Sequence, residues 1–471
     1  MAKIYTNKPG YYGEGSVNVS SSSQPGEGDI RRCTLSKDKL VTQPFEGIDT
    51  VADIVSYSAR THGNRNAMGW RDIIRIVEEE KEVTKVVDGK QVTEKKLWKY
   101  FELSDYKYID YIELKEALSQ ISRALIELGI TKDDVFNVYA QTRCVNPASC
   151  AVTCNESNFC VSLNWQLMAL SCACISTTIA TAYDTLGEEG LTHSLNEPNS
   201  VGIFTNAELL PTLLKVLPQT PTVKYVVYDG EPKQAILDSI RSLRDIQVFS
   251  ISELRELGKT KSIDVLESRL PKKEDMALIM YTSGSTGAPK GVCITHANLI
   301  ASVGAVNLLL GHHLSLGDSF LAYLPLAHVL EYIVELVMIF VGMPLGYGRV
   351  KTLTDASVRN CKGDISAFRP SIMVGVPAVW ETIRKGIIAK VNSGGTIKKN
   401  VFNGAMYVKK KEIPVLAQIA DSVILSGVRA ATGGRLRIAL SGGAAISRDT
   451  QEFLSAALVT VIQGSFSLLP L

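Results

Sequence analysis

Residues 281–291, which read YTSGSTGAPKG, have the composition of a loop that binds phosphate groups. Glycines allow successive backbone N–H groups to face an anion, Ser and Thr hydroxyls add donors, and Lys290 adds a positive charge. This is not a Walker A loop, because Pro289 precedes the lysine and Gly291 follows it. It is also not the G-x-S-x-G turn of hydrolases, because none of its serines has glycine at both −2 and +2. The alternative is a flexible Ser/Gly linker, but linkers rarely follow an apolar strand directly, so the pattern favours a polyphosphate site.

Alternating strand-like and helix-like segments must position this loop. Several strand candidates are continuous apolar runs, as expected for parallel strands covered by helices on both faces. In such sheets ligands bind beyond the carboxyl ends of the strands. The loop and two other unusual segments, LPLAHVLEY (324–332) and ALSGGAAIS (439–447), each follow a candidate strand. The sequence therefore predicts an α/β fold of layered, mostly parallel sheets with a site at the strand ends. The strand candidates are residues 135–140, 201–205, 224–228, 277–281, 319–323, 372–374, 436–440 and 458–462.

A helix is predicted between residues 110 and 129. Its apolar residues fall on one face, Asp110 and Glu113 fit a capping box, and Gly129 suits the C-terminal stop. The residues on the apolar face are Leu114, Leu118, Ile121, Leu125 and Leu128.

Two other segments predict individual elements. Residues 82–98 alternate around Asp88 and Gly89, which is typical of a β-hairpin. The most apolar segment, residues 329–347, carries Glu331 and Glu335. Because charge in lipid is costly, we expect a buried helix there and not a membrane span.

Composition and charge limit the class of protein. The 471 residues are 45% hydrophobic and 21% charged, which allows a sizeable core and about three domains or subdomains. A net charge of +2 argues against a nucleic-acid-binding protein. Nine cysteines without a secretory signal favour a reducing, intracellular compartment. Residues 1–45 contain a Gly/Ser-rich stretch and are expected to form a flexible arm.

Together these segments resemble the adenylate-forming, or AMP-binding, superfamily. YTSGSTGAPKG is similar to its phosphate-binding signature, and the wider resemblance, over residues 45–463, is to a fungal long-chain fatty acid–CoA ligase. It implies that a fatty acid carboxylate attacks the α-phosphate of ATP in the presence of Mg²⁺, giving acyl-adenylate and pyrophosphate, and that the thiol of CoA then displaces AMP. An aromatic acid ligase is an alternative that TAYDTLGEE (181–189) and the hairpin weigh against. The further matching segments are TAYDTLGEEGLTHSLNE (181–197), LPLAHVLEY (324–332), RPSIMVGVPAVWETI (369–383) and LRIALSGGAAIS (436–447).

The resemblance also implies a nucleotide site. By resemblance, a turn that packs against adenine is assigned to residues 442–444, and the pyrophosphate loop to residues 282–290. No protein ligand is assigned to a metal. The turn residues are Gly442, Gly443 and Ala444, and the loop residues are Thr282, Ser283, Gly284, Ser285, Thr286, Gly287 and Lys290.

For the other candidate residues the sequence allows both a functional and a structural interpretation. His328 stands where the family places an aromatic or imidazole side chain near the acyl carboxylate, and a partly buried structural histidine is the equal alternative. Trp380 either lines an acyl tunnel or belongs to the core. The pair His312 and His313 invites a metal site, but no third ligand of suitable spacing is visible, which favours an exposed loop.

The chain departs from the family in three places, of which the mildest is Ala445, where the family usually has Pro after Gly-Gly-Ala. Residues 143–163, RCVNPASCAVTCNESNFCVSL, interrupt a family motif, and their four cysteines fit no usual zinc spacing. A metal-binding or redox insert and a non-native insert, such as translated intron sequence, are the alternatives. After Gly464, the tail 464–471 diverges from the family, so the AMP-binding domain (46–463) is expected to be incomplete and to lack the C-terminal lid.

This expectation has consequences for activity. A chain without the lid lysine and the Mg²⁺ carboxylate is expected to form little or no acyl-CoA. A non-catalytic nucleotide- or lipid-binding product therefore remains an alternative to the ligase. The resemblance further implies peripheral contact with endoplasmic reticulum membranes or lipid-droplet surfaces from the cytoplasm.

Overall fold

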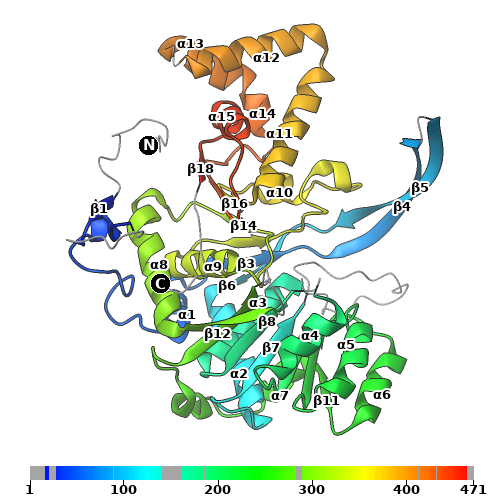
Figure 1. Cartoon of the computed structure of the whole chain (residues 1–471), viewed down its shortest axis with the longest axis vertical. Helices are drawn as coiled ribbons and strands as arrows, with labels where there is room; N and C mark the ends of the chain where they lie inside the picture. Colours follow the sequence, from blue (N-terminus) through cyan, green and yellow to red (C-terminus); the bar gives the residue numbers. More distant parts are fainter. Residues whose placement is uncertain are drawn as a thin grey trace.

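Two seven-stranded sheets form the centre of the molecule (Figure 1). In both sheets one edge strand is antiparallel and the other neighbouring strands are parallel. The predicted α/β fold with mostly parallel sheets is therefore confirmed. This computed structural model describes residues 16–20, 28–87, 90–140, 161–183, 186–282, 289–411, 413–430 and 432–463.

The first sheet has the order β11-β10-β9-β7-β8-β12-β13. Its antiparallel edge strand is β13, which pairs with β12 so that Thr282 lies opposite Lys290. The strands are β7 (Val135–Tyr139), β8 (Thr178–Ala182), β9 (Gly202–Asn206), β10 (Tyr225–Asp229), β11 (Gln247–Ser250), β12 (Met276–Thr282) and β13 (Lys290–Thr295).

The second sheet has the order β18-β17-β16-β14-β15-β3-β6. Here β6 is the antiparallel edge strand, paired with β3. All eight predicted strands are present in the two sheets, with ends shifted by up to three residues. The strands of the second sheet are β3 (Asn66–Trp70), β6 (Lys107–Asp110), β14 (Phe320–Ala322), β15 (Leu345–Tyr347), β16 (Ile372–Gly375), β17 (Ile438–Ser441) and β18 (Val461–Gln463).

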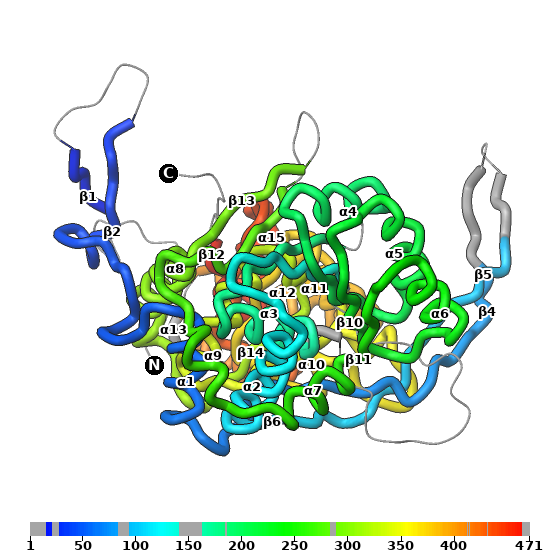
Figure 2. The backbone as a smooth tube through the Cα atoms, turned by 90° about the horizontal axis from the view of Figure 1, so that it is seen from below, coloured from blue at the N-terminus to red at the C-terminus, as the bar shows by residue number. Residues whose placement is uncertain are grey.

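Helices flank both sheets (Figures 1 and 2). The first part of the chain supplies α1 (Val51–His62), α2 (Tyr111–Glu127), α3 (Val161–Cys174), α4 (Gly187–Asn196), α5 (Leu210–Val216), α6 (Gln234–Leu243) and α7 (Ile251–Lys259). The second part supplies α8 (His296–Leu310), α9 (Val329–Val341), α10 (Asp364–Phe368), α11 (Pro377–Asn392), α12 (Gly395–Lys410), α13 (Pro414–Ile419), α14 (Ser426–Ala430) and α15 (Arg448–Ala457).

Two predicted helices are confirmed with their local signals. In α2 the Asp110 side chain accepts from the Glu113 N–H and the Glu113 side chain accepts from the Asp110 N–H, which is the predicted capping box. Gly129 follows the helix with a φ of +81°, a conformation that glycine adopts without strain. Every residue of α9 from 329 to 340 is buried, as predicted for the segment with Glu331 and Glu335. Among the described residues, no helix is both long and apolar enough to span a membrane.

The predicted hairpin is a two-stranded ribbon that projects from the body (Figure 1). Its strands, β4 (Ile73–Val87) and β5 (Lys90–Leu103), extend beyond the predicted range of 82–98. At its base Arg359 forms an ion pair of 2.5 Å with Glu79 and lies over the ring of Tyr100. These contacts attach the ribbon to the segment between β15 and β16 of the second sheet.

Two predicted irregular regions contain regular structure in part. Within residues 1–45, β1 (Ser16–Asn18) and β2 (Arg31–Cys33) form a small antiparallel sheet. Within residues 143–163, helix α3 already begins at Val161, and Leu163 is fully buried. The remainder of that segment lies outside the described residues, and its four cysteines with it.

Candidate nucleotide site

The structure holds both ends of the predicted phosphate loop at the carboxyl end of β12. Thr282 is the last residue of β12 and Lys290 the first of β13, and the Thr282 hydroxyl donates to the Lys290 carbonyl over 3.4 Å. The Lys290 side chain is exposed, and no described carboxylate forms an ion pair with it. Its charge is therefore available to an anionic ligand. Five predicted loop residues, Ser283, Gly284, Ser285, Thr286 and Gly287, lie outside the described residues.

Helix α4 holds the second end of this loop in place. Nε2 of His193 donates to the Pro289 carbonyl over 2.9 Å, one residue before Lys290. The same nitrogen lies 3.6 Å from Oε2 of Glu197, the C-cap of α4, and the His193 ring meets the Tyr281 ring edge-on. Burial, with the nearby Glu197 carboxylate, raises the pKa of Tyr281 and keeps it neutral. This contact has no local signal in the sequence, because 96 residues separate the two partners.

The predicted adenine turn follows β17 directly. The N–H of Gly442 donates to the Gly375 carbonyl over 3.1 Å, which extends the ladder between β17 and β16 by one residue. Gly443 then takes a φ of +80°, which a side chain would strain. Gly443 and Ala444 are exposed, so their backbone is open to a planar ligand.

Trp380 belongs to the core, which decides between its two predicted interpretations. It is fully buried, and its indole N–H donates over 3.2 Å to the Gly375 carbonyl, the same group that accepts from Gly442. Trp380 thus supports the turn from beneath as a core side chain.

His328 caps helix α9 beyond the carboxyl end of β14. Its Nδ1 accepts from the Leu330 N–H over 3.2 Å, so the neutral ring carries its proton on Nε2. Partial burial lowers the pKa of His328, which favours this neutral form. His328 therefore has the structural role of a helix cap. Its Nε2 still carries a proton that it can donate to a carboxylate. Because β14, β16 and β17 are parallel neighbours, His328 and the 442–444 turn share one sheet edge.

Two buried hydroxyls at this edge were not predicted. The Tyr323 hydroxyl and Oγ of Ser441 have no hydrogen-bond partner in the described part of the chain, although both residues are buried. Tyr323 follows β14 and lies against Gly375, where an added Cβ would approach its hydroxyl to 2.8 Å. Buried polar groups normally have partners. These two hydroxyls are therefore candidate ligand contacts beside the 442–444 turn.

Glu331 and Glu335 form a buried acidic pair on α9. Burial, and next the proximity of Glu335, raises the pKa of Glu331 well above its usual value. Burial also raises the pKa of Glu335 to about 8, although the Tyr347 hydroxyl donates to its Oε2 over 2.8 Å. Both carboxyls therefore favour the neutral form, which is consistent with their place in the predicted buried helix.

The sequence allowed either a metal site or an exposed loop at His312 and His313. His312 and His313 lie side by side on a short 3-10 turn, with His312 exposed. Within the described ranges, no group of three His, Cys, Asp or Glu side chains could hold a metal ion.

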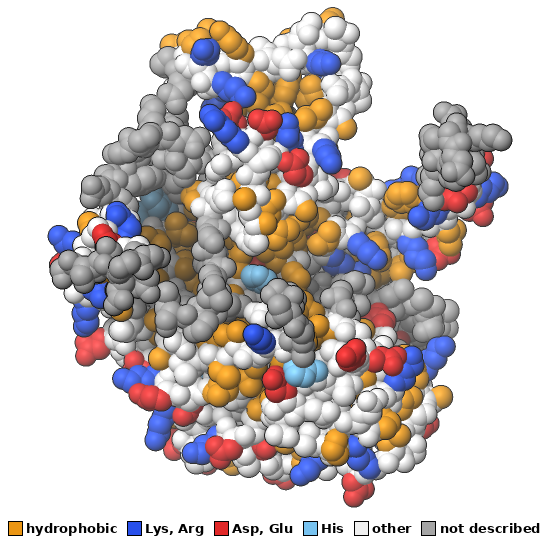
Figure 3. Space-filling view, viewed as in Figure 1, with side chains coloured by type: hydrophobic (Ala, Val, Ile, Leu, Met, Phe, Trp, Pro, Cys, Tyr) orange, Lys and Arg blue, Asp and Glu red, His pale blue; other side chains and the backbone are white. Residues whose placement is uncertain are grey.

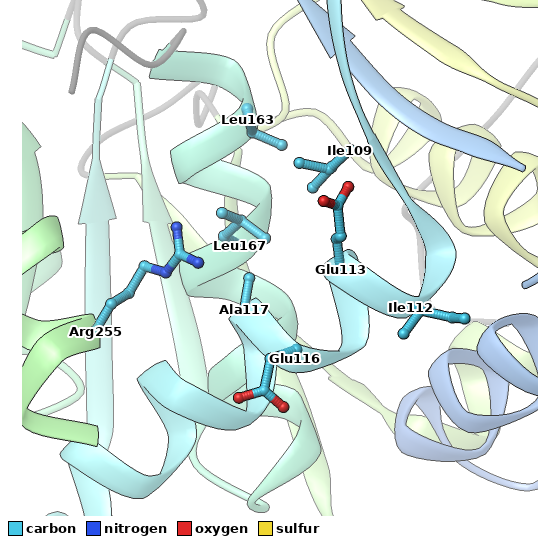
Figure 4. Close-up of a pocket in the computed structure, with 8 residues that line it drawn as sticks. All are labelled: Ile109, Ile112, Glu113, Glu116, Ala117, Leu163, Leu167 and Arg255. Carbon is cyan, nitrogen blue, oxygen red and sulfur yellow. The ribbon is translucent and has the colours of Figure 1, made fainter. Parts of the chain in front are cut away.

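A cavity of 340 Å³ lies away from the predicted site, between α2, α3, α7 and β6 (Figure 4). Its walls are mainly apolar, and Arg255 enters it from α7 with its Nε donating to Gln120. Glu113 and Glu116 at its rim are already used, in the α2 cap and in bonds to Gln120 and Arg123. None of the predicted site residues lines this cavity.

The fold and these strand-end segments define an adenylate-forming protein. Residues 161–465 match the family model described as AMP-binding enzyme. The chain belongs to this family.

The similar curated proteins are long-chain fatty acid–CoA ligases. The chain is 40% identical over 453 residues to long-chain-fatty-acid–CoA ligase 2 of Schizosaccharomyces pombe, covering 95% of this chain and 62% of that protein. It is 37% identical over 470 residues to long-chain-fatty-acid–CoA ligase 1 of Saccharomyces cerevisiae, covering 95% of this chain and 64% of that protein. The chain thus spans less than two thirds of the length of these relatives.

Solved structures share the fold. The adenylation domain of carboxylic acid reductase from Segniliparus rugosus, in complex with AMP and a co-purified carboxylic acid, matches with a TM-score of 0.62 and 16% identity over 91% of this chain and 63% of that chain. A long-chain-fatty-acid–CoA ligase from Archaeoglobus fulgidus matches with a TM-score of 0.54 and 16% identity over 89% of this chain and 62% of that chain. At these identities the likeness shows the fold alone.

Proposed function

We propose that the reaction of this protein is the activation of long-chain fatty acids as their CoA thioesters, through an acyl-adenylate. These 471 residues are expected to carry it out at no more than a low rate, because the lid lysine and the Mg²⁺ carboxylate of the family are not among them. The observation that carries the proposal is the pairing of Thr282 with Lys290 at the carboxyl end of β12, in a chain that is 40% identical to a long-chain fatty acid–CoA ligase. An exposed lysine at the end of a Gly/Ser/Thr loop suits a polyphosphate. The exposed backbone at Gly443 and Ala444 suits the flat face of adenine.

In the proposed reaction, a carboxylate oxygen of the fatty acid attacks the α-phosphorus of ATP, and the bond to the pyrophosphate oxygen breaks. Lys290 and the loop neutralise the charge that gathers on the departing pyrophosphate. Nε2 of His328 donates to the carboxylate and orients it, because its Nδ1 is held by the helix cap. The CoA thiolate then attacks the acyl carbon and AMP leaves.

The remaining cofactor and location assignments belong to the same proposal. Mg²⁺ would supply further neutralisation of the triphosphate, but no described side chains are assigned to hold it. CoA is assigned because the similar proteins are long-chain-fatty-acid–CoA ligases. Long acyl chains partition into lipid, so we place the protein at the cytoplasmic surface of endoplasmic reticulum or lipid droplets.

Equilibrium binding and turnover, measured on the same preparation, test the proposal. ATP binding is followed by calorimetry, and oleoyl-CoA formation from oleate, ATP, Mg²⁺ and CoA by mass spectrometry. ATP binding with oleoyl-CoA formation supports the ligase. ATP binding without product favours the non-catalytic nucleotide-binding alternative, and absence of both results overturns the assignment of the site.

A further inference from the structure

Exposed apolar side chains are concentrated between residues 397 and 423, on α12, α13 and the segments that adjoin them. Helices α12 and α13 lie at the end of the molecule farthest from the first sheet (Figure 1). Of the 25 exposed large hydrophobic residues among those described, eight lie between residues 397 and 423. Monomeric soluble proteins usually scatter such residues singly, and a cluster marks an interaction surface. The eight are Ile397, Val401, Tyr407, Ile413, Val415, Leu416, Ile419 and Val423.

These residues lie on the outer faces of elements that pack against one another. Helix α12 turns Phe402, Ala405 and Met406 into the core, while Ile397 stays 82% exposed. Helix α13 continues into the short π-helix η6 (Ala420–Ile424), and both contact α12. Along them Val415, Ile419 and Val423 recur at intervals of four residues, which forms an apolar stripe. We call the outer face of α12, α13 and η6 the 397–423 face.

Lysines accompany the apolar residues on this face (Figure 3). Lys398, Lys399 and Lys411 are exposed, and none forms an ion pair with a described carboxylate. Asp421, the described acid in this segment, forms ion pairs with Lys409 at 2.7 Å and with Arg429 at 2.5 Å. Residues 395–424 contain five lysines and two acids, Glu412 and Asp421, so the segment has a net positive charge beside its exposed aliphatic side chains.

This composition fits a lipid surface better than a protein partner. Protein interface cores favour aromatic residues and arginine and are poor in lysine. Residues 395–424 contain five lysines and no arginine, and seven of the eight exposed apolar residues are aliphatic. Aliphatic side chains that enter the headgroup region, with lysines that meet anionic headgroups, are typical of helices that lie on a membrane.

We propose that the 397–423 face docks the protein on an anionic lipid surface, with α12 and α13 lying in the headgroup plane. Val415, Ile419 and Val423 insert between headgroups, and Lys398, Lys399 and Lys411 meet lipid phosphates and carboxylates. This inference rests on the lipid-surface location in the proposed function. Docking needs neither ATP nor CoA, so its failure can be distinguished from failure of the proposed ligase reaction.

The test is co-sedimentation of the full chain with vesicles of phosphatidylcholine alone or mixed with phosphatidylserine. We expect binding to the mixed vesicles that weakens as salt is raised. The variant V415S/I419S/V423S should bind at least about tenfold more weakly. The variant K398Q/K399Q/K411Q should bind about 100-fold more weakly at low salt. All six residues are exposed, so thermal unfolding should stay close to that of the parent chain.

Matched controls come from the other end of the molecule. The variants L243S/I263S/L270S and K132Q/K272Q/K273Q remove equally exposed residues and should bind vesicles like the parent chain. Three results would overturn the proposal: a parent chain that ignores mixed vesicles, an apolar variant that binds as tightly as the parent, or controls that lose binding equally. A dimer that V415S/I419S/V423S dissociates, without vesicle binding, would instead assign the face to a second copy.

Discussion

His193 offers the sharpest test of how the phosphate loop is held. The substitution His193→Ala removes the bond from Nε2 to the Pro289 carbonyl, which is 2.9 Å long and half-buried. A bond of this kind contributes about 1 kcal/mol net, which corresponds to a population shift of about fivefold. If that shift reduces the fraction of molecules with Lys290 correctly placed, the Kd for ATP should rise by up to about fivefold.

Two measurements report this effect. Calorimetry gives the Kd for ATP, and hydrogen exchange of the β13 amides, residues 290–295, should be faster in His193→Ala. His193→Gln should restore both values towards the parent, because the Gln amide N–H can reach the same carbonyl. The exchange measurement stands even if ATP does not bind, so it separates the loop's anchoring from the nucleotide assignment.

His62 provides the matched control. Its Nε2 also bonds a backbone carbonyl, that of Phe340, over 3.0 Å, but it lies on α1 against α9. His62→Ala should lower stability by a similar amount without changing the Kd for ATP or exchange in β13. The reasoning is refuted if His193→Ala leaves both values unchanged, or if His62→Ala changes them equally.

Three stability predictions come from buried titratable groups. Asp318→Asn should lower the free energy of unfolding by about 2 kcal/mol, because it weakens the pair between the buried Asp318 and the partly exposed Arg437, and urea denaturation measures this. Burial raises the pKa of Glu335 from 4.5 to about 8, so the folded form binds the proton more tightly than the unfolded form. The free energy of unfolding should therefore fall as the pH rises between these values. The fall should be less steep in Glu335→Gln. Burial lowers the pKa of His296 from 6.5 to about 4, so stability should fall by about 3 kcal/mol as pH drops through that window. In His296→Leu this acid-side loss should be smaller, although the variant starts lower because the Val51 N–H loses its acceptor; equal slopes would contradict this account.

The elements that the sequence predicted well carry their signals locally. Continuous apolar runs mark strands such as β9 and β10, and the Asp110–Glu113 pair marks the start of α2. Strands β3, β6, β8, β11, β13 and β15 were not predicted, and β8 and β15 illustrate two different reasons. β8 consists of Thr, Ile and Ala residues without a strong β pattern, and β15 has three residues. Their strand conformation depends on neighbours that are distant in the sequence.

The residues of the candidate site differ in the same way: some carry a local sequence signal, and others depend on tertiary contacts. Thr282, Lys290 and the 442–444 turn stand in motifs that can be read directly, and the structure places them at strand ends, while their role with nucleotide stays a prediction. The His193 anchor and the unpartnered hydroxyls of Tyr323 and Ser441 depend on tertiary contacts and burial, which no single segment encodes. The burial of Trp380 was likewise open until the fold decided it.

ATP binding by a Lys290 variant is the most direct test of the proposed phosphate loop. Lys290→Met removes the exposed charge at the start of β13, and Lys272→Met removes an equally exposed lysine before the opposite end of β12. Because a bond to a charged group contributes about 1.5–3 kcal/mol, calorimetry should give a Kd for ATP that rises by about 10- to 100-fold in Lys290→Met. The Kd should stay at the parent value in Lys272→Met. A parent chain that does not bind ATP, or a Lys290→Met chain that binds it as tightly as the parent, would contradict the account.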